Sequence, residues 1–593
     1  MRLNAFLVTT IIIVILLFIF IKPLMFLNDE WITGNQINQL DNHHQMIYNE
    51  GKYGYFSKGN PMPYFQERNN ILQYTTYLPI ISYPTLFLIK GFDSNLIFIL
   101  LTLFSLLLII SGIILKERSI SGLYSHHLGN ILILLSVGFF ILNLYFYKGI
   151  SVNPDSSPYE ILGVGFYHLI ILLLLLALIY SICKIIFKEE IYSIFATIAC
   201  ISCSSYLFWA TTMKDHIDTV FYLSLIIFLL LKFQQTKDYW YFPATFIVSG
   251  LLIWVRPEYG VFIAIAIVII LFSFIIAAIR DQEIHTIRLF FLLSPLFTAI
   301  GVIPLFVGNA CTTGNPFLLA WQVKPVTNAV SLNNTSTIPA STTLVTVTET
   351  IVHRLTPVTS SLASDIYGFL ISPLTLKVPL LALTPLFVLA LLLIPFIYLY
   401  LKKRVERNEW ITITILGTFV IATFLAYSTS ITGLSNSVGV YPDVRYLCPT
   451  YIPLNLIGLL ILRKIFSDKN EIKKILIIFC TVLIPGILLL TGLMTYYHSL
   501  LDFWEMFLYL NGITPVIIYI LLGLSFIVIS LKILNITRVN YEIVMIALLM
   551  AALVIWQVSI MMIGNFYPKV FTGYPSLLPI MRAVFEYLYS VGI

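Results

Sequence analysis

Long apolar runs separated by polar segments extend along almost the whole chain. Each run holds about 20 residues, which as a helix cross a hydrocarbon core about 30 Å thick. The pattern therefore predicts an all-α polytopic transmembrane helical bundle of about 13 to 16 spans. The predicted spans cover residues 5–27, 93–115, 129–147, 162–187, 191–209, 216–232, 239–255, 258–279, 289–307, 378–401, 409–427, 446–462, 475–493, 513–533 and 541–563.

One further apolar segment, "YLPIISYPTLFLIKGF" from Tyr77 to Phe92, does not fit this order of spans and loops. If it crossed the membrane, every later loop would change side. Its apolar core is short and is interrupted by Pro79 and Pro84. We therefore expect a half-span or a tilted helix here.

Composition supports a membrane protein, because 59% of the residues are hydrophobic and only 10% are charged. Soluble domains carry about 25% charged residues. The net charge of +6 needs no nucleic-acid partner, because half of the 34 Lys and Arg residues lie in six short loops. Such loops stay in the cytoplasm, so we expect a multi-pass protein of the plasma membrane. The six basic loops are residues 184–190, 232–238, 280–288, 402–407, 463–474 and 532–538.

Two long polar loops lie on the opposite face in this topology. Residues 28–77 contain nine aromatic side chains, which suit short helices at the level of the lipid headgroups. Residues 308–377 contain "NNTSTIPASTTLVTVTET", a composition typical of a flexible lid or a short strand pair above a site. We divide the chain into a catalytic membrane module, residues 1–400, and C-terminal transmembrane helices, residues 401–593.

Ionisable side chains gather at the outer ends of the predicted spans rather than at mid-depth, where a charge is costly. A structural interpretation exists for each, because acids are stabilised at helix N-termini and arginines extend toward headgroups. Their common side and similar depth beneath the two long loops favour a functional site. The residues are Asp29, Glu30, Lys214, Asp215, His216, Asp218, Arg256, Glu258, Asp443 and Arg445.

Acids and arginines together suit the displacement of a phosphate leaving group. A carboxylate takes the proton of an attacking hydroxyl as general base. A guanidinium holds a phosphate with two parallel hydrogen bonds. In sugar transfer with inversion, the departing phosphate needs stabilisation of its charge, which Arg445, Arg256 and Lys214 can supply.

Three stretches resemble motifs of the GT-C superfamily of integral-membrane glycosyltransferases, which use polyprenyl-phosphate sugars. The chain is similar in style to protein O-mannosyltransferases and lipid A aminoarabinose transferases. Acids follow the first span in "NDEWITGNQINQLDNHHQMIYNEGKYG", which begins at Asn28. "GLLIWVRPEYG", from Gly250 to Gly260, and "RYLCPTYIP", from Arg445 to Pro453, match two later motifs. The motifs cover about a tenth of the chain.

The resemblance implies a site on the extracytoplasmic face. Asp29 would be the base or would orient the acceptor, and Glu30 is its neighbour. Arg445 would hold the carrier phosphate, beside Tyr446. Arg256, Lys214 and Asp215 are further candidates for substrate binding. The implied partners are a polyprenyl-phosphate sugar donor (dolichyl or undecaprenyl), membrane lipids and a protein, lipid or glycan acceptor.

No cofactor is assigned, although a divalent cation stays open because metal use varies within the superfamily. His43 and His44 lack a second pair of ligands at metal-binding spacing. Two other functions also stay open. An O-antigen ligase or polymerase would use Arg and His of a late loop, such as His353 and Arg354. A transporter or flippase of lipid-linked sugars would show paired repeats and charged or broken helices near the midplane.

Overall fold

The computed structural model describes most of the helical part of the chain. The described residues are 30–47, 67–68, 71–72, 75–92, single positions between 102 and 113, 123–146, 159–280, 289–319, 370–371, 377–401, 406–427, 442–466, 468–497, 503–536 and 540–566.

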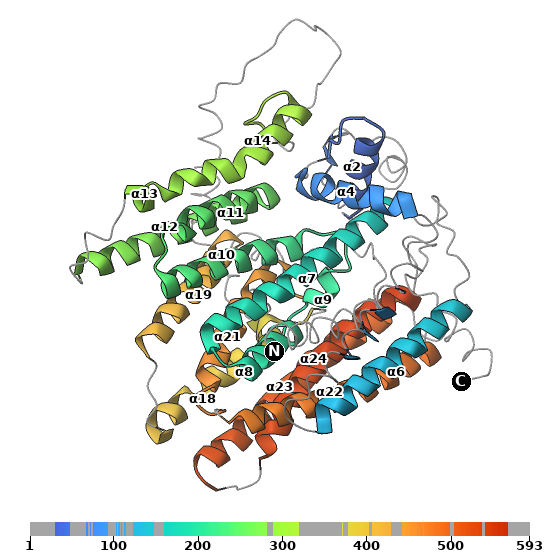
Figure 1. Ribbon diagram of the computed structural model, residues 1–593, viewed down its shortest axis with the longest axis vertical. Coiled ribbons are helices and arrows are strands. Elements are labelled where there is room, and N and C mark those ends of the chain that lie inside the picture. The colour runs from blue at the N-terminus through green and yellow to red at the C-terminus, as the bar shows by residue number, and fades with distance from the viewer. Residues whose placement is uncertain are drawn as a thin grey trace, which may run out of the picture.

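Helices make up nearly all of this described part, which confirms the predicted all-α polytopic bundle (Figure 1). A pair of two-residue antiparallel strands, β1 (Glu67–Arg68) and β2 (Ile71–Leu72), lies in the first outer loop. Among the described residues, nine helices are long and apolar enough to cross a membrane. They are Tyr159–Phe187, His216–Thr236, Pro257–Ala277, Ser294–Thr313, Arg407–Ala426, Arg445–Leu462, Lys469–Leu490, Glu505–Ile533 and Tyr541–Met561.

The helices follow one another with short connections over most of the described chain. Their bounds are α2 (Glu30–Asp41), α4 (Tyr77–Phe92), α6 (Leu123–Phe146), α7 (Tyr159–Phe187), α8 (Glu190–Ser202), α9 (Tyr206–Trp209), α10 (His216–Thr236), α11 (Tyr241–Val255), α12 (Pro257–Arg280), α13 (Leu289–Leu292), η4 (Ser294–Phe297), α14 (Thr298–Thr313), α17 (Leu380–Leu383), α18 (Pro385–Phe396), η6 (Ile397–Leu401), α19 (Arg407–Ala426), η8 (Arg445–Thr450), α21 (Tyr451–Leu462), α22 (Lys469–Tyr497), α23 (Phe503–Ile533) and α24 (Tyr541–Phe566).

Helices α7 and α10 run side by side in the same direction, and α19 runs opposite to them. His168 contacts Asp218 near the beginning of both α7 and α10. At the other end of α10, Gln234 donates to the carbonyl of Asn408, at the beginning of α19. With a rise of about 1.5 Å per residue, the two ends of α10 lie about 30 Å apart. The bundle therefore has two ends at a separation that matches a hydrocarbon core.

Helices α11 and α14 approach each other most closely at two glycines. A Cβ atom on Gly250 would lie 2.4 Å from the carbonyl oxygen of Thr298, and one on Gly301 would lie 2.0 Å from that of Ile247. Small residues let the backbones of membrane helices meet in this way. This contact fixes α11 against α14, and with it Arg256, which follows the last residue of α11.

The segment expected as one span over residues 191–209 is broken, and that prediction is wrong. Helix α8 ends at Ser202, and α9 begins at Tyr206. Asn455 donates to the freed carbonyl of Cys203 at 2.7 Å, and Gln557 donates to that of Ser202 at 3.1 Å. Buried amides from distant helices therefore replace the missing helical hydrogen bonds, as a chain inside a membrane requires.

Ion pairs bring several of the basic loops together at one end of the bundle. Glu189 lies 3.9 Å from Arg463 and 3.8 Å from Lys469. Lys532 lies 2.9 Å from Glu471. These contacts join the first, fifth and sixth of the six basic loops, at the end where α7 and α10 finish. We call this the basic end.

The segment Tyr77–Phe92 forms helix α4, with Pro84 inside it. Its 16 residues extend about 24 Å as a helix, which is shorter than a hydrocarbon core of about 30 Å. Figure 1 places α2 and α4 beside the beginning of α7, away from the basic end. Thr85 of α4 donates to the carbonyl of Gly163 in α7 at 2.7 Å. The first outer loop is thus anchored to the opposite end of the bundle.

Candidate functional site

The centre of the site is an ion pair between Asp215 and Arg256. Asp215 precedes α10, and Arg256 follows α11, so the two helices bring together residues that are 41 positions apart. Nε of Arg256 donates to Oδ2 of Asp215 at 2.8 Å, and Nη2 donates to Oδ1 at 2.6 Å. Burial alone would raise the pKa of the Asp215 carboxyl, but the charges of Arg256 and Lys214 hold it below its usual value. Asp215 is therefore an ionised brace for Arg256 and a poor general base.

Two further contacts fix the guanidinium of Arg256. Its Nη1 donates to the hydroxyl of Tyr427 at 3.2 Å, and its Nη2 lies 3.1 Å from Nδ1 of His216. Because a guanidinium only donates, Nδ1 of His216 accepts, and the imidazole is neutral with its proton on Nε2. Burial raises the pKa of Tyr427 to about 12, so its hydroxyl keeps its proton. The position of Arg256 is thus fixed from three sides.

A second arginine, Arg445, meets the same group of side chains. Its Nη2 donates to the hydroxyl of Tyr446 at 3.3 Å, and its guanidinium lies 5.0 Å from the centre of that ring. The guanidinium of Arg256 lies 5.8 Å from the same ring. Both arginines and the buried Lys214 act electrostatically on His216. Three cationic side chains therefore gather around the turn from Lys214 to His216.

Asp443 holds the segment that carries Arg445 in place. Its carboxylate accepts hydrogen bonds from Ser205 at 2.5 Å, from Tyr451 at 2.6 Å and from the indole of Trp209 at 3.0 Å. Burial raises the pKa of Asp443, and these three donors oppose that rise. The ring of Trp209 lies 4.4 Å from that of His216. The break between α8 and α9 thus supplies two donors that position Arg445 relative to His216.

A second buried network lies one helical turn further along α10, around Asp218. Oδ1 accepts from Tyr167 at 2.6 Å and from Tyr77 at 3.0 Å, and Oδ2 lies 3.1 Å from Nε2 of His168. Nδ1 of His168 lies 2.7 Å from the carbonyl of Thr212, which can only accept. Nδ1 therefore carries a proton, and another proton lies in the hydrogen bond between Nε2 of His168 and Oδ2 of Asp218. This network ties α4 and α7 to the turn of the site.

Sequence reasoning missed His168 and the two tyrosines. The signal for His168 was present, because it is an ionisable residue inside an apolar run, "GVGFYHLIILL". Nothing in the sequence pairs it with Asp218, which lies 50 positions away.

Helix α2 brings the first outer loop against this turn. Glu30, the first residue of α2, is fully buried. Thr33 donates to the carbonyl of Met213 at 3.5 Å. Residues three apart share one face of a helix, so Glu30 lies on the face that meets the segment before Lys214. Asp29 lies outside the described residues.

Gln36, one turn beyond Thr33, is also fully buried. Neither Nε2 nor Oε1 of its amide has a hydrogen-bond partner among the described residues. Leaving such a buried group unsatisfied costs about 1–3 kcal/mol. The amide of Gln36 therefore stays unsatisfied within the described part of the chain.

The structure thus brings six of the seven predicted site residues, or the elements that carry them, to one end of the bundle. They are Glu30, Lys214, Asp215, Arg256, Arg445 and Tyr446. His353 and Arg354, named for the ligase alternative, lie outside the described residues. The described residues contain no group of three or more His, Cys, Asp or Glu side chains placed to hold a metal ion.

Comparison with solved structures finds a similarity to crystal structures of ArnT. No family model and no curated protein matches the sequence. In fold, the chain is similar to ArnT from Cupriavidus metallidurans in the apo state, with a TM-score of 0.42 and 10% identity over 95% of this chain and 77% of that one. ArnT bound to undecaprenyl phosphate matches with a TM-score of 0.37 and 11% identity over 72% of this chain and 66% of that one.

A TM-score below 0.5 transfers neither a residue role nor an activity to this chain. The chemistry of the site must therefore be argued from its own residues.

Proposed function

We propose that this protein is a membrane glycosyltransferase that takes a sugar from a polyprenyl-phosphate donor. The observation that carries the proposal is the meeting of Lys214, Arg256 and Arg445 around one turn, at the end of the bundle opposite the basic end. Asp215 supplies one carboxylate to this group through its pair with Arg256, and the excess of positive charge at the turn attracts an anionic ligand. The phosphate of a polyprenyl-phosphate sugar, which lies between the lipid tail and the sugar, can supply such a negative charge at the membrane surface.

The three cations have different roles in this proposal. Arg256 is braced by Asp215 and Tyr427, so it supplies a fixed positive charge. Arg445 is held beside Tyr446 and binds the donor phosphate through its guanidinium. Lys214 adds a point charge from the turn itself. Together they stabilise the negative charge that develops on the phosphate as the sugar leaves.

The base comes from the first outer loop. Asp29 takes the proton of the acceptor hydroxyl, and Glu30 lies beside it at the start of α2. One carboxylate on the face opposite the leaving phosphate is sufficient for transfer with inversion. Gln36 lies on the same helix as Glu30, and its buried amide offers a donor and an acceptor to sugar hydroxyls. This arrangement leaves protein, lipid and glycan acceptors open.

The site faces the outside of the cell in this proposal. Loops rich in Lys and Arg remain in the cytoplasm, and the ion pairs of Glu189, Lys469 and Lys532 gather such loops at the other end. Charges at both ends of the helices also favour catalysis at a membrane surface over transport, which needs polar groups near the midplane.

The decisive experiment measures binding of undecaprenyl phosphate to the purified protein in nanodiscs by native mass spectrometry. Arg445→Ala should weaken binding about 10- to 100-fold, because a hydrogen bond to a charged group contributes about 1.5–3 kcal/mol. Arg280→Ala removes an exposed arginine at the end of α12 and is the matched control. Equal affinity in wild type and Arg445→Ala would contradict the assignment of the phosphate site.

The transferred sugar and its acceptor are identified in cells. Mass spectrometry of surface glycans with and without the gene should reveal a sugar that depends on this protein. An unchanged glycan profile together with intact binding of the carrier lipid would argue for a different use of the donor.

A further inference from the structure

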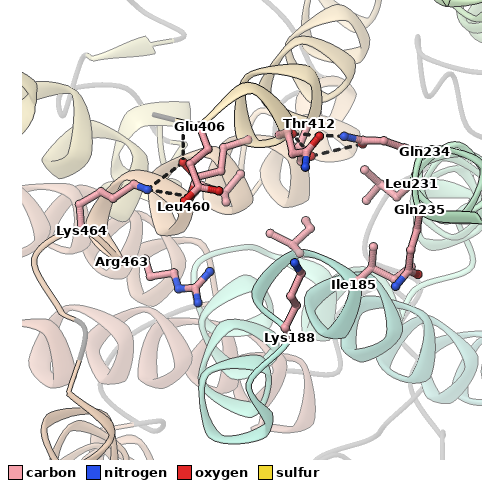
Figure 2. Close-up of a pocket in the computed structure, with 13 residues that line it drawn as sticks. Ile185, Lys188, Leu231, Gln234, Gln235, Glu406, Thr412, Leu460, Arg463 and Lys464 are labelled. Carbon is pink, nitrogen blue, oxygen red and sulfur yellow. Dashed lines mark hydrogen bonds and ion pairs between the residues drawn. The ribbon is translucent and has the colours of Figure 1, made fainter. Parts of the chain in front are cut away.

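A polar cavity of about 660 Å³ lies at the basic end, on the opposite side of the bundle from the proposed donor site. The ends of α7, α10 and α21 and the beginning of α19 form its walls (Figure 2). From His216 to Gln234, α10 spans about 27 Å at about 1.5 Å per residue, so the two sites are separate.

The two acids of the cavity are satisfied within the protein. Glu406 and Glu409 form the capping box of α19, in which each side chain binds the backbone N–H of the other. Lys464 lies 2.8 Å from Glu409 and neutralises it. Glu406 keeps its negative charge, but the lining holds three cations and two acids, so its net charge is +1.

Two cationic side chains of the lining, Lys188 and Arg463, are not part of the pair between Lys464 and Glu409. Figure 2 shows Lys188 and Arg463 on the side of the cavity that faces Gln234 and Thr412. Among the described residues, Lys188 forms no side-chain ion pair, and its backbone takes the left-handed conformation, with φ of 63°. The closest carboxylate oxygen to Arg463 belongs to Glu189 at 3.9 Å, a partly exposed pair of little strength.

Polar and apolar groups complete the lining. Gln234 donates to the carbonyl of Asn408 at 3.2 Å and accepts from Thr412 at 3.4 Å, which holds its amide across the gap between α10 and α19. Ile185, Ile186, Leu231 and Leu460 supply apolar surface. The volume of the cavity lies within the range of about 300–1,000 Å³ that is typical of small-molecule sites.

We propose that this cavity binds a phosphate ester at the cytoplasmic face. The phosphate lies between the guanidinium of Arg463 and the ammonium of Lys188, where both form charge-assisted hydrogen bonds. Hydroxyl groups of the ester meet the amides of Gln234 and Gln235. The same chemistry occurs in an anionic phospholipid headgroup and in a soluble polyol phosphate. Basic pockets between membrane helices on the cytoplasmic side bind lipid headgroups in this manner.

The test compares the two sources on the full-length protein. In the lipid arm, native mass spectrometry counts phospholipids retained from nanodiscs of phosphatidylcholine alone and of phosphatidylcholine with about 20% phosphatidylglycerol, a fraction typical of an anionic leaflet. In the soluble arm, thermal unfolding in phosphatidylcholine nanodiscs is followed while sn-glycerol 3-phosphate or inorganic phosphate is added. A saturable rise in the unfolding temperature reports binding.

Arg463→Gln and Lys188→Gln should each weaken binding about tenfold or more in the arm that is positive, because each removes one charge-assisted contact. Lys469→Gln removes a charge from the same loop as Arg463, with 66% of the side chain exposed, and is the matched control. An unchanged unfolding temperature in the absence of added ligand shows that each variant is folded. Binding in neither arm, or an equal loss in the control, overturns the proposal.

Discussion

Replacement of Asp215 by Asn tests the ion pair at the centre of the site. The variant keeps the shape of the side chain and removes its charge, which leaves the guanidinium of Arg256 without its carboxylate. The side chains of Arg256 and Asp215 are only 15% and 8% exposed. Removing one partner of a buried pair costs about 3–5 kcal/mol, because the other charge stays buried. We therefore expect Asp215→Asn to lower the free energy of unfolding by about 3 kcal/mol or more.

The assay is reversible unfolding in mixed detergent micelles, followed by the fluorescence of tryptophan. Asp238→Asn is the matched control, because Asp238 is exposed at the other end of α10 and accepts a hydrogen bond from the backbone of Trp240. A third variant, Asp215→Asn with Arg256→Gln, removes both charges. It should recover part of the lost stability, because no charge is then buried alone.

Two results would refute this reasoning. If Asp215→Asn is as stable as Asp238→Asn, the pair does not stabilise the fold. If the loss of stability in the double variant equals the sum of the losses in Asp215→Asn and Arg256→Gln, the charges of Asp215 and Arg256 do not stabilise each other.

Three further predictions concern the base, the helix crossing and the response to acid. Asp29→Asn should abolish sugar transfer without unfolding the protein, because an amide cannot take a proton. In the same transfer assay Asp41→Asn should stay active, because Asp41 forms an exposed ion pair with Lys90. Gly250→Ala should destabilise by about 1–3 kcal/mol in the same unfolding assay, since the new Cβ meets backbone atoms, whereas Gly417→Ala has open space. The pKa of Asp215 is lowered in the folded protein, so its stabilisation is complete above the unfolded value of about 3.9 and is lost as the pH falls below it. The difference in unfolding temperature between wild type and Asp215→Asn should therefore shrink below about pH 4.

Many single helices could be predicted from the sequence, because apolar length is a local property. The expected spans 216–232 and 258–279 correspond to α10 and α12, which the structure extends to Thr236 and Arg280. The break after Ser202 could not be predicted, because the amide groups that satisfy it come from Asn455 and Gln557, more than 250 positions away. A hydropathy pattern does not contain such partners.

The sequence by itself determined that the chain is a polytopic helical protein and that its basic loops and its acid-arginine clusters lie at opposite ends of the helices. Both follow from apolar length and from the high cost of a charge inside a bilayer, which act on each segment separately. Only the tertiary structure decided which charges meet, such as Asp215 with Arg256 and Asp218 with His168. Those choices depend on how helices pack around one another, and side chains that are far apart in the chain become neighbours only when the bundle forms.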